Sequence, residues 1–208
     1  YFKMGFSEMH LNSVLHTPII MSLLRAKLYS VELGAIATRH GLIPDMTVIY
    51  KKREVEIAVV ESSKSKLTDD IAKNEGDKIK LAVLMHDQLT TIHDELAKEE
   101  KESEIRKIEV YGICTSKLEM RIFVMHLSAP ELYVFYEIFS ITLPSTINDF
   151  ESLKNSIIQL IRFRVILDTN REIFSNILKS NESTTPINQI NWVVEVDDSP
   201  ISLLKKTS

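Results

Sequence analysis

A long amphipathic pattern in the middle of the chain divides its strand-like segments into two groups. From Asp69 and Asp70 onward, apolar residues recur at steps of three and four and predict one long helix; they are Leu81, Leu84, Met85, Leu89, Ile92 and Leu96. Segments rich in valine, isoleucine and aromatic residues predict strands on both sides of it; they are residues 45–50 and 55–62 before, and 108–114, 120–127 and 132–143 after. This order favours an α/β (α+β) domain with a central sheet.

Two further helices are predicted at the ends of this arrangement. Thr17-Pro18 is typical of a helix start, and apolar residues at helical spacing extend the first helix over residues 17–41. A second helix follows Pro144, with apolar residues from Phe150 to about Leu178. We therefore expect a mixed sheet of five strands flanked by helices, in a single domain over residues 1–180. Residues 181–208 are polar and are expected to form a tail or a segment that a partner orders.

Composition excludes several classes of protein. The 208 residues carry a formal net charge of −4, which argues against a surface coated for nonspecific nucleic-acid binding but leaves a local basic groove open. Cys114 is the only cysteine, so neither a disulfide framework nor a cysteine zinc cluster is available. No apolar run approaches the roughly 20 residues that span a bilayer. We expect an intracellular protein, nuclear or cytoplasmic, that does not enter a membrane.

Two acidic residues stand at the ends of neighbouring predicted strands. In the stretch IPDMTVIYKKREVEIAVVESSKSK, Asp45 begins the first strand and Glu61 ends the second, so antiparallel pairing would bring the two carboxylates together. Adjacent strands lie about 4.8 Å apart, and Mg²⁺ prefers carboxylate oxygens. An alternative stays open, in which Asp45 only favours a turn after proline and Glu61 is a paired carboxylate at a strand end.

These residues resemble the signature of the PD-(D/E)XK nuclease superfamily, in which a Pro-Asp precedes a strand that carries an acid, any residue and a lysine. Pro44-Asp45 and Glu61 match it, and the family's order of helix, sheet, helix and strand covers roughly residues 18–127. The chain is also similar to fungal proteins of this general type. The resemblance implies a restriction-endonuclease-like fold and a Mg²⁺ site, with Glu32, Asp45 and Glu61 as metal ligands.

Further roles follow from the same resemblance. It implies Asp45, Glu61 and Lys64 as the catalytic set, and it makes lysines on the long helix candidates for contacts with nucleic acid: Lys73, Lys78 and Lys80.

The sequence departs from the signature at the lysine. Ser63 occupies that position, and Lys64, one residue later, would face the other side if the strand continued. The strand could end at Ser62 and let Lys64 turn back, or a lysine on the following helix could substitute. Two functions therefore remain: a degenerate nuclease-fold module that binds protein partners, itself or nucleic acid, and an active Mg²⁺-dependent phosphodiesterase that cleaves DNA or RNA. The Ser63 substitution and the acidic net charge favour the module.

Two other patterns have ordinary structural interpretations. His86-Asp87 and His93-Asp94 are seven residues apart, about 10.5 Å along a helix, which is too far for both histidines to bind one metal; we expect them on the polar face of the long helix. The last strand is aromatic, which favours core or interface packing over stacking on bases; its rings belong to Tyr133, Phe135, Tyr136 and Phe139.

Overall fold

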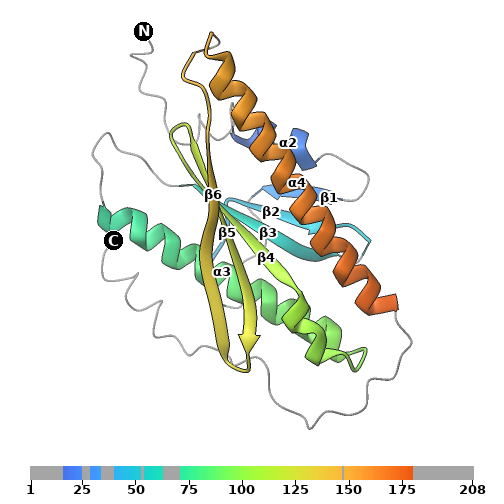
Figure 1. The fold of residues 1–208 in the computed structure, drawn as a ribbon. Helices are drawn as coiled ribbons and strands as arrows, with labels where there is room; N and C mark the ends of the chain where they lie inside the picture. The colour runs from blue at the N-terminus through green and yellow to red at the C-terminus, as the bar shows by residue number, and fades with distance from the viewer. Residues whose placement is uncertain are drawn as a thin grey trace.

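The computed structural model describes residues 16–24, 29–33, 40–52, 54–62, 71–146 and 148–179. Within these residues the chain forms three α-helices, one short 3-10 helix and six strands (Figure 1). Their order is α2 (Thr17–Leu24), β1 (Tyr29–Leu33), β2 (Met46–Tyr50), β3 (Val55–Ser62), α3 (Ile71–Ala97), η2 (Glu102–Lys107), β4 (Glu109–Ser116), β5 (Glu119–Ala129), β6 (Leu132–Thr142) and α4 (Phe150–Lys179).

The six strands form one mixed sheet in which the spatial order equals the order in the chain, β1-β2-β3-β4-β5-β6. Four neighbouring pairs are antiparallel, and β3 with β4 is the parallel pair. Parallel neighbours need a long crossover connection, and α3 lies between these two strands in the chain. The long central helix is thus the element that joins two antiparallel halves of the sheet.

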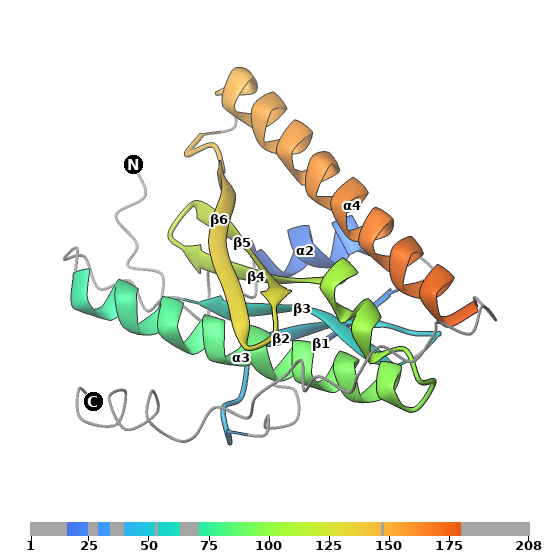
Figure 2. The ribbon, with the colours of Figure 1, turned by 60° about the horizontal axis from the view of Figure 1, so that its bottom comes forward.

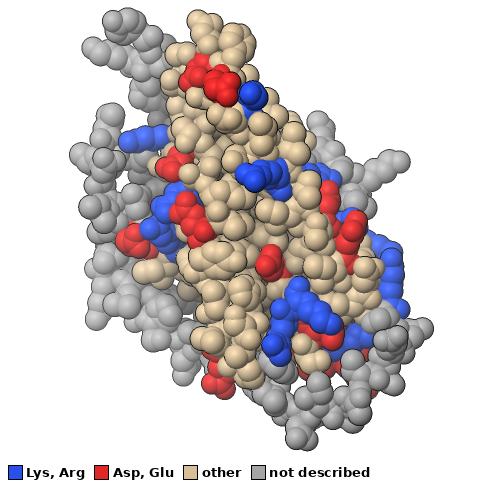
Figure 3. All heavy atoms as spheres, in the orientation of Figure 1, with Lys and Arg blue, Asp and Glu red and all other residues tan. Residues whose placement is uncertain are grey.

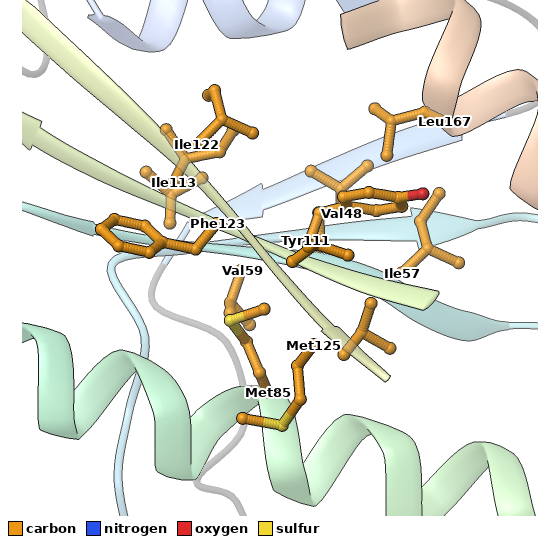
Figure 4. Close-up of a cluster of buried hydrophobic side chains, with 14 of the residues drawn as sticks. Val48, Ile57, Val59, Met85, Tyr111, Ile113, Ile122, Phe123, Met125 and Leu167 are labelled. Atoms are coloured by element: carbon orange, nitrogen blue, oxygen red, sulfur yellow. The ribbon is translucent and has the colours of Figure 1, made fainter. Parts of the chain in front are cut away.

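Helices cover both faces of the sheet (Figure 2). Because side chains alternate along a strand, Gly112 and Tyr111 in β4 lie on opposite faces. The Gly112 face packs against Met85 and Leu81 of α3, and the Tyr111 ring packs edge-on against Phe163 of α4. Figure 4 shows Met85 and Leu167 approaching the strands from opposite sides. The molecule therefore has three layers, and a side chain's strand position decides which helix it meets.

The first predicted helix is wrong in its second half. Helix α2 ends at Leu24, and Tyr29–Leu33 forms strand β1, which pairs with β2 along its whole length. Spacings such as Leu28 to Val31 fit a helical stripe, but YSVEL also alternates. Pairing with β2 decided between them, and the Tyr29 hydroxyl donates a hydrogen bond to Asp168 Oδ1 of α4 at 2.7 Å.

Strand β1 also makes the predicted count of five strands wrong, because the sheet has six. The other predicted strands and helices are present, with ends that differ by a few residues. The charged run at residues 94–107 completes α3 and then forms η2, which buries Ile105. The predicted tail at 181–208 lies outside the described residues, and the predicted domain limits stay a prediction. No helix of the described part of the chain is long and apolar enough to cross a membrane.

The close packing of Gly112 in β4 against helix α3 can be tested by substitution. A Cβ atom added to Gly112 would lie 2.5 Å from Sδ of Met85 and 2.8 Å from two atoms of Leu81. We expect Gly112→Ala to lower the free energy of unfolding by about 1–3 kcal/mol, because overpacking forces α3 away from the sheet. Urea unfolding measures this change.

The matched control is the same substitution in a Met85→Ala background. Removing the methionine side chain makes room for the new methyl group, so the double variant should lose less stability than the two single losses summed. Strict additivity would contradict the proposed contact.

Candidate active site

Two hydrogen bonds hold Asp45 against the end of strand β3. Its backbone N–H donates to the carbonyl of Val60 at 3.1 Å, and Oδ2 accepts the backbone N–H of Ser62 at 2.8 Å. These bonds continue the antiparallel pairing of β2 with β3. The predicted pairing is therefore confirmed, and it places Asp45 beside the residue that follows Glu61.

Glu61 is buried on the face of the sheet that α3 covers. It pairs in register with Cys114 of β4, two residues beyond Gly112 on the same face, and only 6% of it is exposed. Its Oε1 accepts a hydrogen bond from Lys80 Nζ at 2.5 Å. One carboxylate oxygen is thus paired, and the other, Oε2, is buried without a hydrogen-bond partner among the described residues.

Helix α3 supplies two charged residues to this site, Asp77 and Lys80. They are three residues apart and therefore lie on one side of the helix, immediately before Leu81, the first buried residue of the apolar stripe. Asp77 also has a buried oxygen, Oδ2, without a hydrogen-bond partner in the described part of the chain. The site accordingly contains three carboxylates and one ammonium group, contributed by the end of β3, the start of β2 and the first half of α3.

The electrostatic environment raises the pKa of Glu61 from 4.5 to about 7. Burial is the largest cause, and the negative charges of Asp45 and Asp77 add to it. Lys80 opposes both effects through its hydrogen bond and its charge. Close to neutral pH, the Glu61 carboxyl is therefore divided between its protonated and ionised forms. This places a group that can hold or release a proton in the site.

The structure brings together some of the predicted site residues and separates others. Asp45, Glu61 and Lys80 form one site, whereas Glu32 is exposed on β1 and its charge acts on Glu56, whose pKa is raised mainly by burial. Lys78 pairs with Glu75 on its own helix at 2.6 Å.

Two predicted lysines have no described side chain. Lys64 and Ser63 lie outside the described residues, and Lys73 belongs to α3 without a described side chain. The predicted roles of all these residues stay predictions.

Sequence reasoning missed Asp77. The sequence does contain a signal for Asp77. Asp77 and Lys80 form an i, i+3 pair on the helical turn that precedes the buried apolar stripe of α3. The helix follows the strand that carries Glu61, so that turn returns to the same region of the sheet.

Metal binding can be assessed from the oxygen atoms present. Within the described part of the chain, no group of three or more histidine, cysteine, aspartate or glutamate side chains is placed to hold a metal ion. Mg²⁺ often binds through one or two carboxylates and completes its shell with water and substrate oxygens. Asp45 and the unpaired Oε2 of Glu61 are the carboxylate groups from which a Mg²⁺ site of that kind would have to be built.

The prediction for His86 and Asp87 is wrong. Both are buried, with 7% and 4% exposed, rather than lying on a solvated face. Asp87 Oδ1 is 2.6 Å from Nδ1 of His40, and the ring of His86 packs edge-on against Tyr133 with 4.6 Å between centroids. The long helix is enclosed at this point by residues that precede β2 and by β6, which its own periodicity did not reveal.

Most of the aromatic rings of β6 serve packing. Phe135 stacks on Phe123 of β5 with 5.1 Å between centroids, Phe139 packs edge-on against Phe163, and Tyr133 contacts His86. Tyr136 is the exception at 45% exposed. Three of the four rings are accordingly half-buried and pack against the core.

Comparison of the chain with protein-family models, with curated proteins and with solved structures finds no match. The case for a function therefore rests on the geometry of the site.

Titration of Glu61 predicts a pH dependence of stability. Its pKa is higher in the folded protein than in the unfolded chain. The stability that Glu61 contributes by binding its proton more tightly in the folded protein is therefore complete below about pH 4.5, and it is lost as the pH rises towards 7. Glu61→Gln cannot titrate. We expect the stability of this variant relative to the wild type to improve by about 2–3 kcal/mol between pH 4.5 and 7.5, measured by urea unfolding in EDTA. A difference that does not change with pH would contradict the raised pKa.

The thiol of Cys114 should be unreactive in the folded protein. Burial raises its pKa to about 12, and the charge of Asp77 adds to the effect. Since the thiolate is the nucleophile, we expect alkylation by iodoacetamide at pH 8 to be on the order of 1,000-fold slower in the native protein than in urea. Mass spectrometry over time measures both rates, and equal rates would show that the thiol is accessible.

Proposed function

We propose that this chain is a PD-(D/E)XK-like domain in which Lys80 replaces the lysine missing after Glu61, and that it cleaves phosphodiester bonds in DNA or RNA with Mg²⁺. One observation carries the proposal: Lys80 Nζ lies 2.5 Å from Oε1 of Glu61, on the sheet face that α3 covers. We infer that this lysine from the following helix takes the role of the motif lysine.

The arrangement of the elements supports the same proposal. Helix α2, an antiparallel strand group, helix α3 and the parallel strand β4 follow one another, which is the helix, sheet, helix and strand order of that superfamily. The Pro-Asp and the acid stand at the joined ends of two antiparallel strands. This kinship would also account for a carboxylate in a buried position, where it is costly without a bound partner.

Each residue has a distinct role in the proposed reaction. Asp45 and Glu61 would hold Mg²⁺, which when bound neutralises phosphate charge and lowers the pKa of bound water. Asp45 is fixed by its bond to the Ser62 amide, which orients its free oxygen. The Lys80 ammonium keeps part of Glu61 ionised near neutral pH, and it can donate to a phosphate oxygen that gains negative charge.

A second function, binding without cleavage, is favoured by the burial of Glu61. A carboxylate that is 6% exposed and shares its charge with Lys80 admits a phosphate only if neighbouring residues move aside. In this case the acidic site would be a structural remnant, and the domain would bind nucleic acid or protein partners through its surface.

Cleavage assays distinguish the two functions. We expect the wild type to cut labelled single- and double-stranded DNA or RNA with Mg²⁺ or Mn²⁺ and to stop in EDTA. Asp45→Asn, Glu61→Gln and Lys80→Met should each lower the rate at least about 100-fold, because each removes a charge that the transition state needs. Circular dichroism verifies that each variant is folded.

Lys98→Met provides the matched control. Lys98 directly follows the C-terminal end of α3 and is exposed and paired with Glu95, so this variant should cut at the wild-type rate. Cleavage that persists in both Asp45→Asn and Lys80→Met would overturn the site. Oligonucleotide binding, measured by fluorescence anisotropy, without any cleavage would support the second function.

A further inference from the structure

Helix α4 carries a second apolar face in its N-terminal half, besides the face that packs on the sheet. Its buried residues include Phe163, Leu167 and Phe174. On the other side of the same helix, six large apolar residues are 37–72% exposed. We call them the α4 stripe: Phe150, Leu153, Ile157, Ile158, Ile161 and Val165.

The α4 stripe is continuous along the helix. Leu153, Ile157, Ile161 and Val165 follow at steps of four, so they form one ridge that is inclined to the helix axis. From Phe150 to Val165 the stripe spans roughly 22 Å. Figures 1 and 2 show this half of α4 projecting past the strands, and Figure 3 shows a mostly uncharged surface there with acidic and basic groups at its upper end and a basic group farther along. Contiguous apolar surface of this size on a soluble domain marks an interaction site.

Two opposite charges border the α4 stripe. Glu151 and Arg162 are both exposed and are eleven residues apart, so a helical twist of 100° per residue puts them within roughly 20° of each other on one edge. Lys154 lies near the same end, and its Nζ is 3.6 Å from Glu151 Oε1. The edge of the stripe thus carries an acidic residue at its beginning, next to Lys154, and a basic residue towards its end.

This pattern is complementary to itself. When two copies of the helix pack antiparallel, residues on the same edge meet. Glu151 of each copy then faces Arg162 of the other, so the twofold symmetry produces this contact twice. Parallel packing would instead place this edge of the two copies on opposite sides of the interface, so that Glu151 of one copy could not meet Arg162 of the other. The antiparallel arrangement also opposes the two helix dipoles favourably.

We propose that the α4 stripe is the interface of a twofold-symmetric homodimer, in which two copies of α4 pack antiparallel. Ile157 lies near the twofold axis, with Leu153 of one copy close to Ile161 of the other. Ridges of residues at steps of four interlock at a crossing angle of about 50°. The interface is isologous, so one stripe supplies both halves.

Sedimentation equilibrium of the full chain tests the proposal. At protein concentrations up to about 100 µM, a range that reveals micromolar dissociation constants, we expect a monomer–dimer equilibrium. Ile157→Asp combined with Ile161→Asp should weaken dimerisation at least about 100-fold, because two charges per copy would be buried in the interface.

The matched control places the same two charges outside the α4 stripe, on the same helix. Asn176→Asp with Lys179→Asp changes exposed residues in the last turn of α4, well beyond Val165, and should leave the dimer intact. A wild type that is monomeric over the whole range, or a control that dissociates as much as the stripe variant, would overturn the proposal.

Charge exchange tests the antiparallel pairing and does not depend on removing apolar contacts. Glu151→Arg alone puts arginine against arginine in its homodimer, and Arg162→Glu alone puts glutamate against glutamate. Each should dimerise several-fold more weakly than the wild type at low salt, and the double exchange should restore wild-type affinity.

Mixing the two single variants is the decisive measurement. In the mixed dimer both contacts pair arginine with glutamate, so we expect heterodimers to exceed either homodimer, as seen by native mass spectrometry. A statistical mixture, or weakening that the double exchange does not reverse, would show that these charges do not face each other and would overturn the antiparallel dimer.

Discussion

The ion pair between Lys80 and Glu61 fixes the relation between helix α3 and the sheet at the point where the candidate site lies. It follows from the parallel placement of β3 and β4, which requires α3 to return across one face of the sheet. Glu61 at the end of β3 then meets the turn of α3 that precedes its buried stripe. The two residues are 19 positions apart in the chain, and their contact connects the acidic site to the core.

This pair is better explained by function than by stability. Removing two charges from water costs several kcal/mol per ion, and their attraction often only offsets that cost. Here the compensation is incomplete, because the pKa of Glu61 remains near 7 and its Oε2 is unpaired in the described part of the chain. Buried groups with such perturbed pKa values cluster at functional sites. A hydrophobic pair of similar volume would hold α3 in place as well without offering a proton or a ligand oxygen.

The proposed catalytic site and the proposed dimer interface occupy different layers. The carboxylates of the site lie on the sheet face covered by α3, whereas α4 packs on the opposite face (Figure 2). Dimerisation through the α4 stripe would therefore not cover the acidic site of either copy.

Much of the fold was determined by the sequence through local periodicity. The valine- and isoleucine-rich run of β3, the apolar stripe of α3 and the proline before Asp45 each specify an element within a few residues of its observed limits. The proximity of Asp45 to Glu61 also followed, because a short turn between two strands leaves antiparallel pairing as the simple outcome.

Contacts between distant segments were decided only by the tertiary structure. YSVEL became a strand because β2 offered it hydrogen bonds, although its local spacing also suited a helix. The ion pair of Lys80 with Glu61, and the burial of His86, depended on how α3 lies across the sheet. Local periodicity records which side of an element is apolar, but not which element will cover that side. The distances that create a site arise only when the layers pack.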